Sequence, residues 1–157
     1  MLVDTDVLIW HLRGYAQATR RLDQLDSLTL SAVSYMEVLQ GMRNKTELAA
    51  VKKMLELRAA RIVPLTEVTT QQAIALMESH TLSHGLQMGD ALIAATALEH
   101  RLTLVTGNVK HFRAINGLQL EAFVPSGWQI HIVMEVPMGR ASILNLHPRQ
   151  ASRRYCS

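Results

Sequence analysis

Short apolar segments with β-prone residues alternate with longer segments of helical periodicity along most of this chain. The strand-like segments lie at residues 1–5, 28–33, 61–65 and 102–106. Apolar residues recur at helical spacing in the segments 5–12, 18–28, 34–42, 46–60, 66–83 and 91–100. We expect 107–112 to be a loop or a short helix. Strands separated by helices predict an α/β fold, in which a parallel sheet is covered by helices on both faces.

A parallel sheet also predicts where a functional site can lie, because ligands bind beyond the carboxyl ends of its strands. Asp4 and Thr106 both fall at such ends. Two further acids, Glu37 and Asp90, lie near predicted helix starts. One fold could therefore gather three carboxylates, Asp4, Glu37 and Asp90, around a divalent metal ion.

Each of these acids also has a purely structural explanation. Asp4 could cap the first helix, and Asp90, directly after Gly89, could cap the helix that follows it. Ser34 and Glu37 have the S-x-x-E spacing of a capping box. Taken one at a time, the acids do not separate capping from catalysis.

Composition sets the class of protein. The chain has 157 residues, 48% of them apolar, which suits one domain with an ordinary core. No run approaches the roughly 18 apolar residues of a membrane span, and the early charges of Asp4 and Asp6 do not fit a signal peptide. We therefore expect a cytoplasmic protein with no membrane partner. The single cysteine, Cys156, excludes an internal disulfide framework and a cysteine-based zinc site.

The character of the chain changes near Pro125. Up to that residue, twelve Lys and Arg balance twelve Asp and Glu, so the net charge of +3 comes from the C-terminal part of the chain. Residues 128–136 alternate like a strand, and the rest, rich in Arg, Ser and Pro, is predicted to be flexible. We expect one domain over residues 1–125 and a C-terminal extension over 126–157.

Four motifs stand in a characteristic order: VDTDVLI, SAVSYMEVLQG, GDALIAATALEH and LVTGNVKHF. Together they span roughly residues 1–124, and the chain resembles the PIN-domain ribonucleases, specifically the VapC-type toxins of bacterial toxin–antitoxin pairs. The resemblance implies a three-layer α/β/α fold with a central parallel five-stranded sheet. It also implies a Mg²⁺- or Mn²⁺-dependent endoribonuclease that a cognate antitoxin holds inactive.

The resemblance assigns roles to particular residues. Asp4, Glu37 and Asp90 match the three acidic positions of the family, with Asp4 and Asp90 as direct metal ligands. Thr106 and Asn108 match the polar pair that orients the first acid and the attacking water. Because like charges share one site, we expect raised carboxylate pKa values without metal.

Two positions depart from the family pattern. Asp6 stands where relatives commonly have Asn, and it could supply an outer-shell contact through water. Many relatives carry a fourth acid near the closing Phe of the last motif, whereas this chain has His111 beside Phe112. With fewer carboxylates, a one-metal site is favoured. His111 could bind a phosphate or transfer a proton, or it could be an exposed loop histidine.

The implied partners are an RNA substrate, a VapB-like antitoxin and a second copy of this chain. DNA would be bound only indirectly, through the antitoxin. The RNA target, transfer RNA or ribosomal RNA, is not readable from the sequence.

Two other functions compete. The run Asp4-Thr5-Asp6-Val7 also resembles the D-x-D-x signature of haloacid-dehalogenase-like phosphatases, in which Asp4 would be the nucleophile, but Ala94 stands where their later acid is needed. The second competing function is that of a catalytically inert PIN-like module that binds RNA or a partner. Separately, His80 and His84 lie one helical turn apart and could ligate zinc, although no H-E-x-x-H pattern accompanies them.

Overall fold

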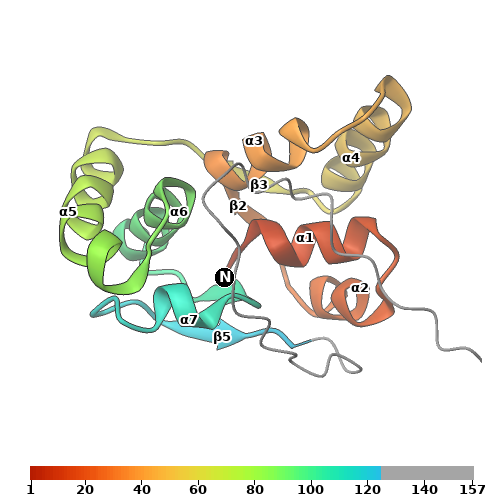
Figure 1. Cartoon of the computed structure of the whole chain (residues 1–157). Helices are drawn as coiled ribbons and strands as arrows, with labels where there is room; N and C mark the ends of the chain where they lie inside the picture. The colour runs from red at the N-terminus through yellow and green to blue at the C-terminus, as the bar shows by residue number, and fades with distance from the viewer. Residues whose placement is uncertain (125–157) are drawn as a thin grey trace, which may run out of the picture.

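The computed structural model describes residues 1–124, which form five strands and seven helices around one sheet (Figure 1). The strands are β1 (Leu2–Val3), β2 (Thr29–Ser31), β3 (Arg61–Val63), β4 (Leu104–Thr106) and β5 (Leu120–Ala122). The helices are α1 (Thr5–Leu12), α2 (Ala16–Asp23), α3 (Ala32–Gln40), α4 (Lys45–Leu57), α5 (Glu67–His84), α6 (Met88–Glu99) and α7 (Val109–Phe112). The alternation of strands and helices is thus confirmed, and 107–112 ends in a short helix.

All four strand pairings are parallel, and the sheet order is β3-β2-β1-β4-β5. The predicted five-stranded parallel sheet is therefore confirmed. β1 lies at its centre, with Leu2 opposite Thr29 of β2 and Val3 opposite Val105 of β4. This register places Asp4, which follows β1, beside Thr106, which ends β4, at one edge of the sheet.

Helices cover both faces of the sheet, and each face has its own hydrophobic core. Leu2 and Leu104 point into a core built mainly with α5, α6 and α7, whereas Val3 and Val105 point into a core built with α1 to α4. Successive strand residues face opposite sides, which gives this separation. Figure 1 shows α5 and α6 on one side of the molecule and α1, α2 and α4 on the other. The three-layer α/β/α prediction is confirmed.

Helix α6 explains how a carboxylate can be carried close to the sheet. Its residues Ala91, Ala94, Ala95 and Ala97 are fully buried. Small side chains let this helix approach its neighbours closely, and they leave the first turn, with Asp90, at the carboxyl edge of the strands. The alanine-rich segment was correctly predicted as a helix.

Two predicted caps are wrong. Helix α3 begins at Ala32, two residues before the predicted start, because the Ser31 hydroxyl caps it by accepting a hydrogen bond from the Ser34 backbone N–H at 2.9 Å. Ser34 and Glu37 therefore lie inside the helix and form no capping box. Asp90 is no cap either, since α6 begins at Met88 and Asp90 lies within its first turn.

Some helices and strands begin or end at other residues than the sequence predicted. β3 stops before Pro64, which has no N–H to donate to a strand ladder. The helix expected over 18–28 is α2, which starts and ends earlier.

No helix of the described residues is long and apolar enough to cross a membrane. The strand expected over 128–136 and the extension from 126 lie outside the described residues.

Candidate active site

Asp4 is the most tightly held of the predicted site residues. It follows β1 and caps α1, with its Oδ1 accepting a hydrogen bond from the Thr5 backbone N–H at 2.7 Å. Its Oδ2 accepts a hydrogen bond from the Thr106 hydroxyl at 2.6 Å. Only 4% of Asp4 is exposed. The Asp4 carboxylate caps α1 and also contacts Thr106, so capping does not exclude the predicted role in a site.

Glu37 reaches the same place from α3. Its Oε2 accepts a hydrogen bond from the Thr5 hydroxyl at 2.5 Å, which joins α3 to the start of α1. Glu37 also lies against the first turn of α6, so closely that a Cβ at Gly89 would overlap with its Oε1. The positive end of the α6 dipole favours a carboxylate there. Gly89 thus has a packing role that its place in the sequence does not reveal.

Asp6 contributes a fourth carboxylate. Its Oδ2 accepts a hydrogen bond from the Gly107 backbone N–H at 2.9 Å. Its Oδ1 is buried and has no hydrogen-bond partner in the part of the chain that the structure describes. An unpaired buried carboxylate oxygen is costly, so this atom is suited to a cation or to a water molecule held by one.

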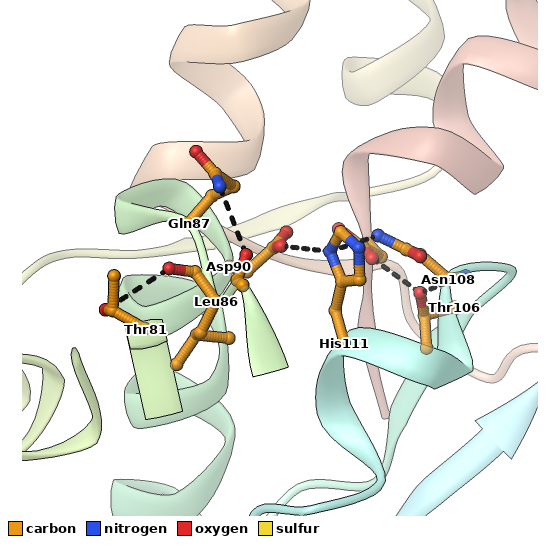
Figure 2. Close-up of polar contacts among 9 residues, drawn as sticks. Thr81, Leu86, Gln87, Asp90, Thr106, Asn108 and His111 are labelled. Atoms are coloured by element: carbon orange, nitrogen blue, oxygen red, sulfur yellow. Dashed lines mark hydrogen bonds and ion pairs between the residues drawn. The ribbon is translucent and has the colours of Figure 1, made fainter. Parts of the chain in front are cut away.

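Asp90 is paired with His111, as Figure 2 shows. The imidazole Nδ1 of His111 lies 2.7 Å from Asp90 Oδ2, and the side-chain amide of Asn108 lies 2.8 Å from the same nitrogen. An ionised carboxylate can only accept, so a hydrogen bond between Nδ1 and Asp90 requires the proton to be on Nδ1. The Asn108 atom that faces Nδ1 is the amide nitrogen Nδ2, and the donor in that contact depends on the tautomer of the ring.

His111 is therefore not an exposed loop histidine. It lies on α7, its side chain is 24% exposed, and it belongs to a chain of contacts that runs across the site. The Asn108 backbone N–H donates to the Thr106 hydroxyl at 2.9 Å, and Thr106 in turn donates to Asp4. His111 and Asn108 thereby connect Asp90 to Asp4 through protein groups alone.

We call Asp4, Asp6, Glu37 and Asp90 the carboxylate cluster. Burial, and then the charge of Asp6, raises the pKa of Asp4 to about 8, although hydrogen bonds from Thr106 and Thr5 oppose the shift. Burial also raises the pKa of Asp6 to about 6. Burial raises the pKa of Glu37, with a smaller contribution from the charge of Asp90. The expectation of raised carboxylate pKa values is confirmed for Asp4 and Glu37.

The charges of the four acids indicate which ion the carboxylate cluster can bind. Asp90 acts electrostatically on the three other acids, so all four share one local field. A divalent cation would relieve their repulsion, and an all-oxygen donor set suits Mg²⁺ or Mn²⁺. Among residues 1–124, no three His, Cys, Asp or Glu side chains already lie in a finished ligand arrangement. The donors fit such a cation by chemistry and by the unpaired Asp6 oxygen, and binding it requires side-chain adjustment.

Replacing Gly89 with Ala tests how closely Glu37 must approach α6. The new Cβ would displace the flexible end of Glu37 rather than backbone, and Ala favours a helix by about 1 kcal/mol. We expect an unchanged or raised melting temperature together with roughly tenfold weaker Mn²⁺ binding, measured by calorimetric titration. Gly41→Ala is the matched control, because a Cβ there makes only an ordinary contact at 3.5 Å. Mn²⁺ affinity equal to that of the wild type would refute this role for Gly89.

The structure brings together every residue that the sequence suggested for the site. It also shows contacts to the site from residues that the sequence did not assign to it. Thr5 holds both Asp4 and Glu37, and the backbone N–H of Gly107 holds Asp6. Gly107 is also too close to the Trp10 ring for any side chain to fit. The only signal for these contacts was that Thr5 and Gly107 adjoin predicted site residues.

Comparisons with known proteins agree with this geometry. The PIN domain family model matches residues 1–118. Ribonuclease VapC10 of Mycobacterium tuberculosis is 40% identical over 129 residues, which cover 80% of this chain and 95% of that protein. A toxin–antitoxin complex from Klebsiella pneumoniae superposes with a TM-score of 0.64 at 29% identity, covering 74% of this chain and 93% of that one.

A third similarity concerns the fold alone. VapBC2 from Rickettsia felis, solved bound to a DNA fragment from its promoter, gives a TM-score of 0.69 at 21% identity, with 78% of this chain and 98% of that chain covered. The family model covers most of the chain, and VapC10 exceeds 30% identity over nearly its whole length. This chain therefore belongs to the PIN-domain family and, within it, to the VapC ribonucleases.

Proposed function

We propose that this protein is an endoribonuclease toxin that hydrolyses RNA phosphodiester bonds with Mg²⁺ or Mn²⁺ bound at the carboxylate cluster. The observation that supports the proposal most strongly is the shared field of four acids at the carboxyl edge of the sheet. Four acids brought this close together oppose one another's ionisation, and a bound cation would relieve that opposition. The nuclease is the domain expected over residues 1–125.

Each acid has a proposed role. Asp4 and Asp90 are the direct ligands of the cation, and Glu37 is the third carboxylate. Asp6 acts through water, in keeping with its unpaired Oδ1. A bound divalent cation supplies Lewis acidity, which lowers the pKa of water and offsets negative charge on the phosphate. Because His111 replaces a fourth acid near the last motif, we propose one cation rather than two.

The uncharged residues hold this arrangement in place. Thr106 fixes the orientation of the Asp4 carboxylate through its 2.6 Å hydrogen bond, and Asn108 supports both Thr106 and His111. His111 donates from Nδ1 to Asp90, which leaves Nε2 as its free ring nitrogen. We propose that Nε2 contacts a phosphate oxygen of the RNA or transfers a proton during cleavage.

The proposed partners follow from the family and from the charge of the site. A VapB-like antitoxin would inhibit the enzyme by covering the carboxylate cluster, for which a basic side chain is the complementary group. Of the two solved neighbours described above, the Klebsiella pneumoniae structure is a toxin–antitoxin complex and the Rickettsia felis VapBC2 structure is bound to DNA. DNA would thus be bound through the antitoxin. We propose a homodimer as the form that binds it, located in the cytoplasm.

The phosphatase alternative lacks its second acid. Ala94 stands at the position where that acid would be needed, and it is fully buried in α6. Glu37 would also have no role in such an enzyme, although it is fixed in the site by Thr5. The inert-module alternative is distinguished by activity and is therefore an outcome of the next experiment.

Cleavage of RNA by the purified chain tests the proposal. We expect cleavage with Mg²⁺ or Mn²⁺ and none with excess EDTA, with activity restored when the metal is added back. Ca²⁺ in place of Mg²⁺ is a useful comparison, because it tolerates longer bonds and irregular geometry. If the chain binds Mn²⁺ but cuts no RNA of any class, it is the inert module. Cutting that persists in EDTA would contradict the metal-dependent mechanism.

A further inference from the structure

A second group of metal-ligating side chains lies outside the carboxylate cluster, at the C-terminal end of α5. His80 and His84 are one turn apart on this helix, and their ring centroids are 5.5 Å apart with an angle of 67° between the rings. Two imidazoles bound to one tetrahedral Zn²⁺ through bonds of about 2.0 Å would have centroids roughly 5 Å apart. The observed separation is thus close to that of a chelate, before any ion is added.

The hydrogen bonding of the two rings leaves suitable nitrogens free. His84 Nδ1 lies 2.7 Å from the Ser83 hydroxyl, which fixes its ring and leaves Nε2 as the ligand nitrogen. His80 Nδ1 is buried and has no hydrogen-bond partner among the described residues. Because Nδ1 is buried, Nε2 is the ring nitrogen left for an ion. Neither ring is committed to the catalytic arrangement.

We propose that His80 and His84 form a two-residue chelate for a divalent transition-metal ion of the kind that prefers imidazole, such as Zn²⁺, with water completing its coordination. Histidines four residues apart on one helix face are a known zinc-binding spacing. The negative end of the helix dipole also favours a cation in the last turn of α5. Imidazole donors do not suit Mg²⁺, so this site and the carboxylate cluster select different ions.

The position of the pair indicates a structural consequence. α5 ends at His84, and only three residues separate it from α6, whose first turn carries Asp90. This connection is held by the Thr81 hydroxyl, which donates to the Leu86 carbonyl at 3.4 Å, and by the Gln87 amide, which donates to the Gly85 carbonyl at 3.1 Å (Figure 2). A cation joining His80 and His84 would fasten the last turn of α5 and so steady this connection.

Zinc titration of the full chain tests the proposal, with saturating Mg²⁺ present to occupy the carboxylate cluster. We expect His84→Gln to lose one equivalent of bound Zn²⁺ relative to the wild type, or to weaken that equivalent by at least tenfold. Other histidines and Cys156 are unchanged in this comparison. His80→Gln should have the same effect.

The best control keeps the number of histidines constant. In the double variant Leu82→His with His84→Gln, the histidines lie two residues apart and point to different sides of the helix, so chelation is lost. Leu82 is fully exposed and accepts the substitution without disturbing the core. We expect this variant to behave like His84→Gln. Zinc binding equal to that of the wild type in both variants would overturn the proposal.

Hydrogen exchange supplies a second, local readout that does not depend on activity. In the wild type, Zn²⁺ should slow amide exchange in residues 81–86, and in the two His84 variants it should not. Slowing that is identical in all three proteins, or confined to other segments, would mean that zinc binds elsewhere. Either result would overturn the chelate, and neither bears on whether the chain cleaves RNA.

Discussion

Replacing Asp90 with Asn should reduce RNA cleavage by at least about a hundredfold while the protein stays folded. Asp90 is one of the two proposed direct ligands, and its charge acts on Asp4, Asp6 and Glu37. The substitution removes one negative charge without changing the shape of the side chain. Asp90 lies in the first turn of α6 but does not cap it, so the helix should lose no more than about 1 kcal/mol. The measurement is the rate of RNA cleavage at saturating Mg²⁺, with the melting temperature as the check on folding.

Asp26→Asn is the matched control for this prediction. It removes the same charge from an exposed residue on the loop between α2 and β2, away from the carboxyl edge of the sheet. Its cleavage rate should stay within about twofold of the wild type. Asp4→Asn should lose activity as Asp90→Asn does. Cleavage by both cluster variants at near wild-type rates would remove the basis of the assignment.

The metal-free protein should become less stable as pH rises from 5 to 8. Asp4 keeps its proton up to about pH 8 in the folded chain, compared with an ordinary pKa of 3.8, and Asp6 keeps its proton up to about pH 6. Between the ordinary pKa of an aspartate, 3.8, and the raised pKa in the folded chain, the folded chain binds more protons than the unfolded chain. The free energy of unfolding therefore falls as pH rises. We expect the melting temperature to fall by several degrees over this range. Differential scanning calorimetry in the presence of EDTA measures it.

Asp4→Asn isolates the effect of the cluster from other titrations. Burial lowers the pKa of His11, which changes stability in the opposite direction near its ordinary value of 6.5. Glu47 and Glu99 have pKa values lowered by hydrogen bonds, and their effect is confined to pH values below about 4.5. The variant should show a weaker loss of stability with pH, and Mg²⁺ should stabilise the wild type more at pH 8 than at pH 5. An identical pH dependence in both proteins would show that Asp4 is not the titrating group.

The parts of the fold that the sequence predicted are those with a clear apolar pattern. β1, β2 and β4 are runs of buried residues, and α6 is a continuous alanine-rich segment. The type of each of these elements can therefore be predicted from its own residues. β5 could not be located in the same way. It pairs only with β4 at the edge of the sheet, and its residues Leu120–Ala122 are partly or fully exposed. An edge strand of this kind has no pattern that separates it from a loop.

The candidate site, too, has residues that the sequence predicts and contacts that it does not. Asp4, Glu37 and Asp90 were predictable because each belongs to a recognisable motif at a strand end or near a helix start. The contacts of Thr5 with Glu37 and of Gly107 with Asp6 join residues 32 and 101 positions apart, and only the folded sheet brings them together. The capping-box interpretation of Ser34 and Glu37 failed for a related reason. Ser31, three residues before Ser34, caps the helix instead, and Glu37 bonds to Thr5 of another helix.

His111 is the residue whose interpretation the structure changed most. From the sequence it was either a functional replacement for a fourth acid or an exposed loop residue. Its 2.7 Å contact with Asp90 removes the second interpretation. The same contact explains why the carboxylates are not yet arranged as ligands, since Asp90 Oδ2 is held by the imidazole.

Anomalous diffraction from a crystal soaked in Mn²⁺ tests the central claim most directly, because it locates the cation independently of activity. The account predicts one Mn²⁺ bonded to the carboxylates of Asp4 and Asp90, with Glu37 and Asp6 beside it and His111 displaced from or turned about Asp90. A crystal that contains millimolar Mn²⁺ but no anomalous peak between Asp4 and Asp90, or only peaks elsewhere on the chain, would contradict it.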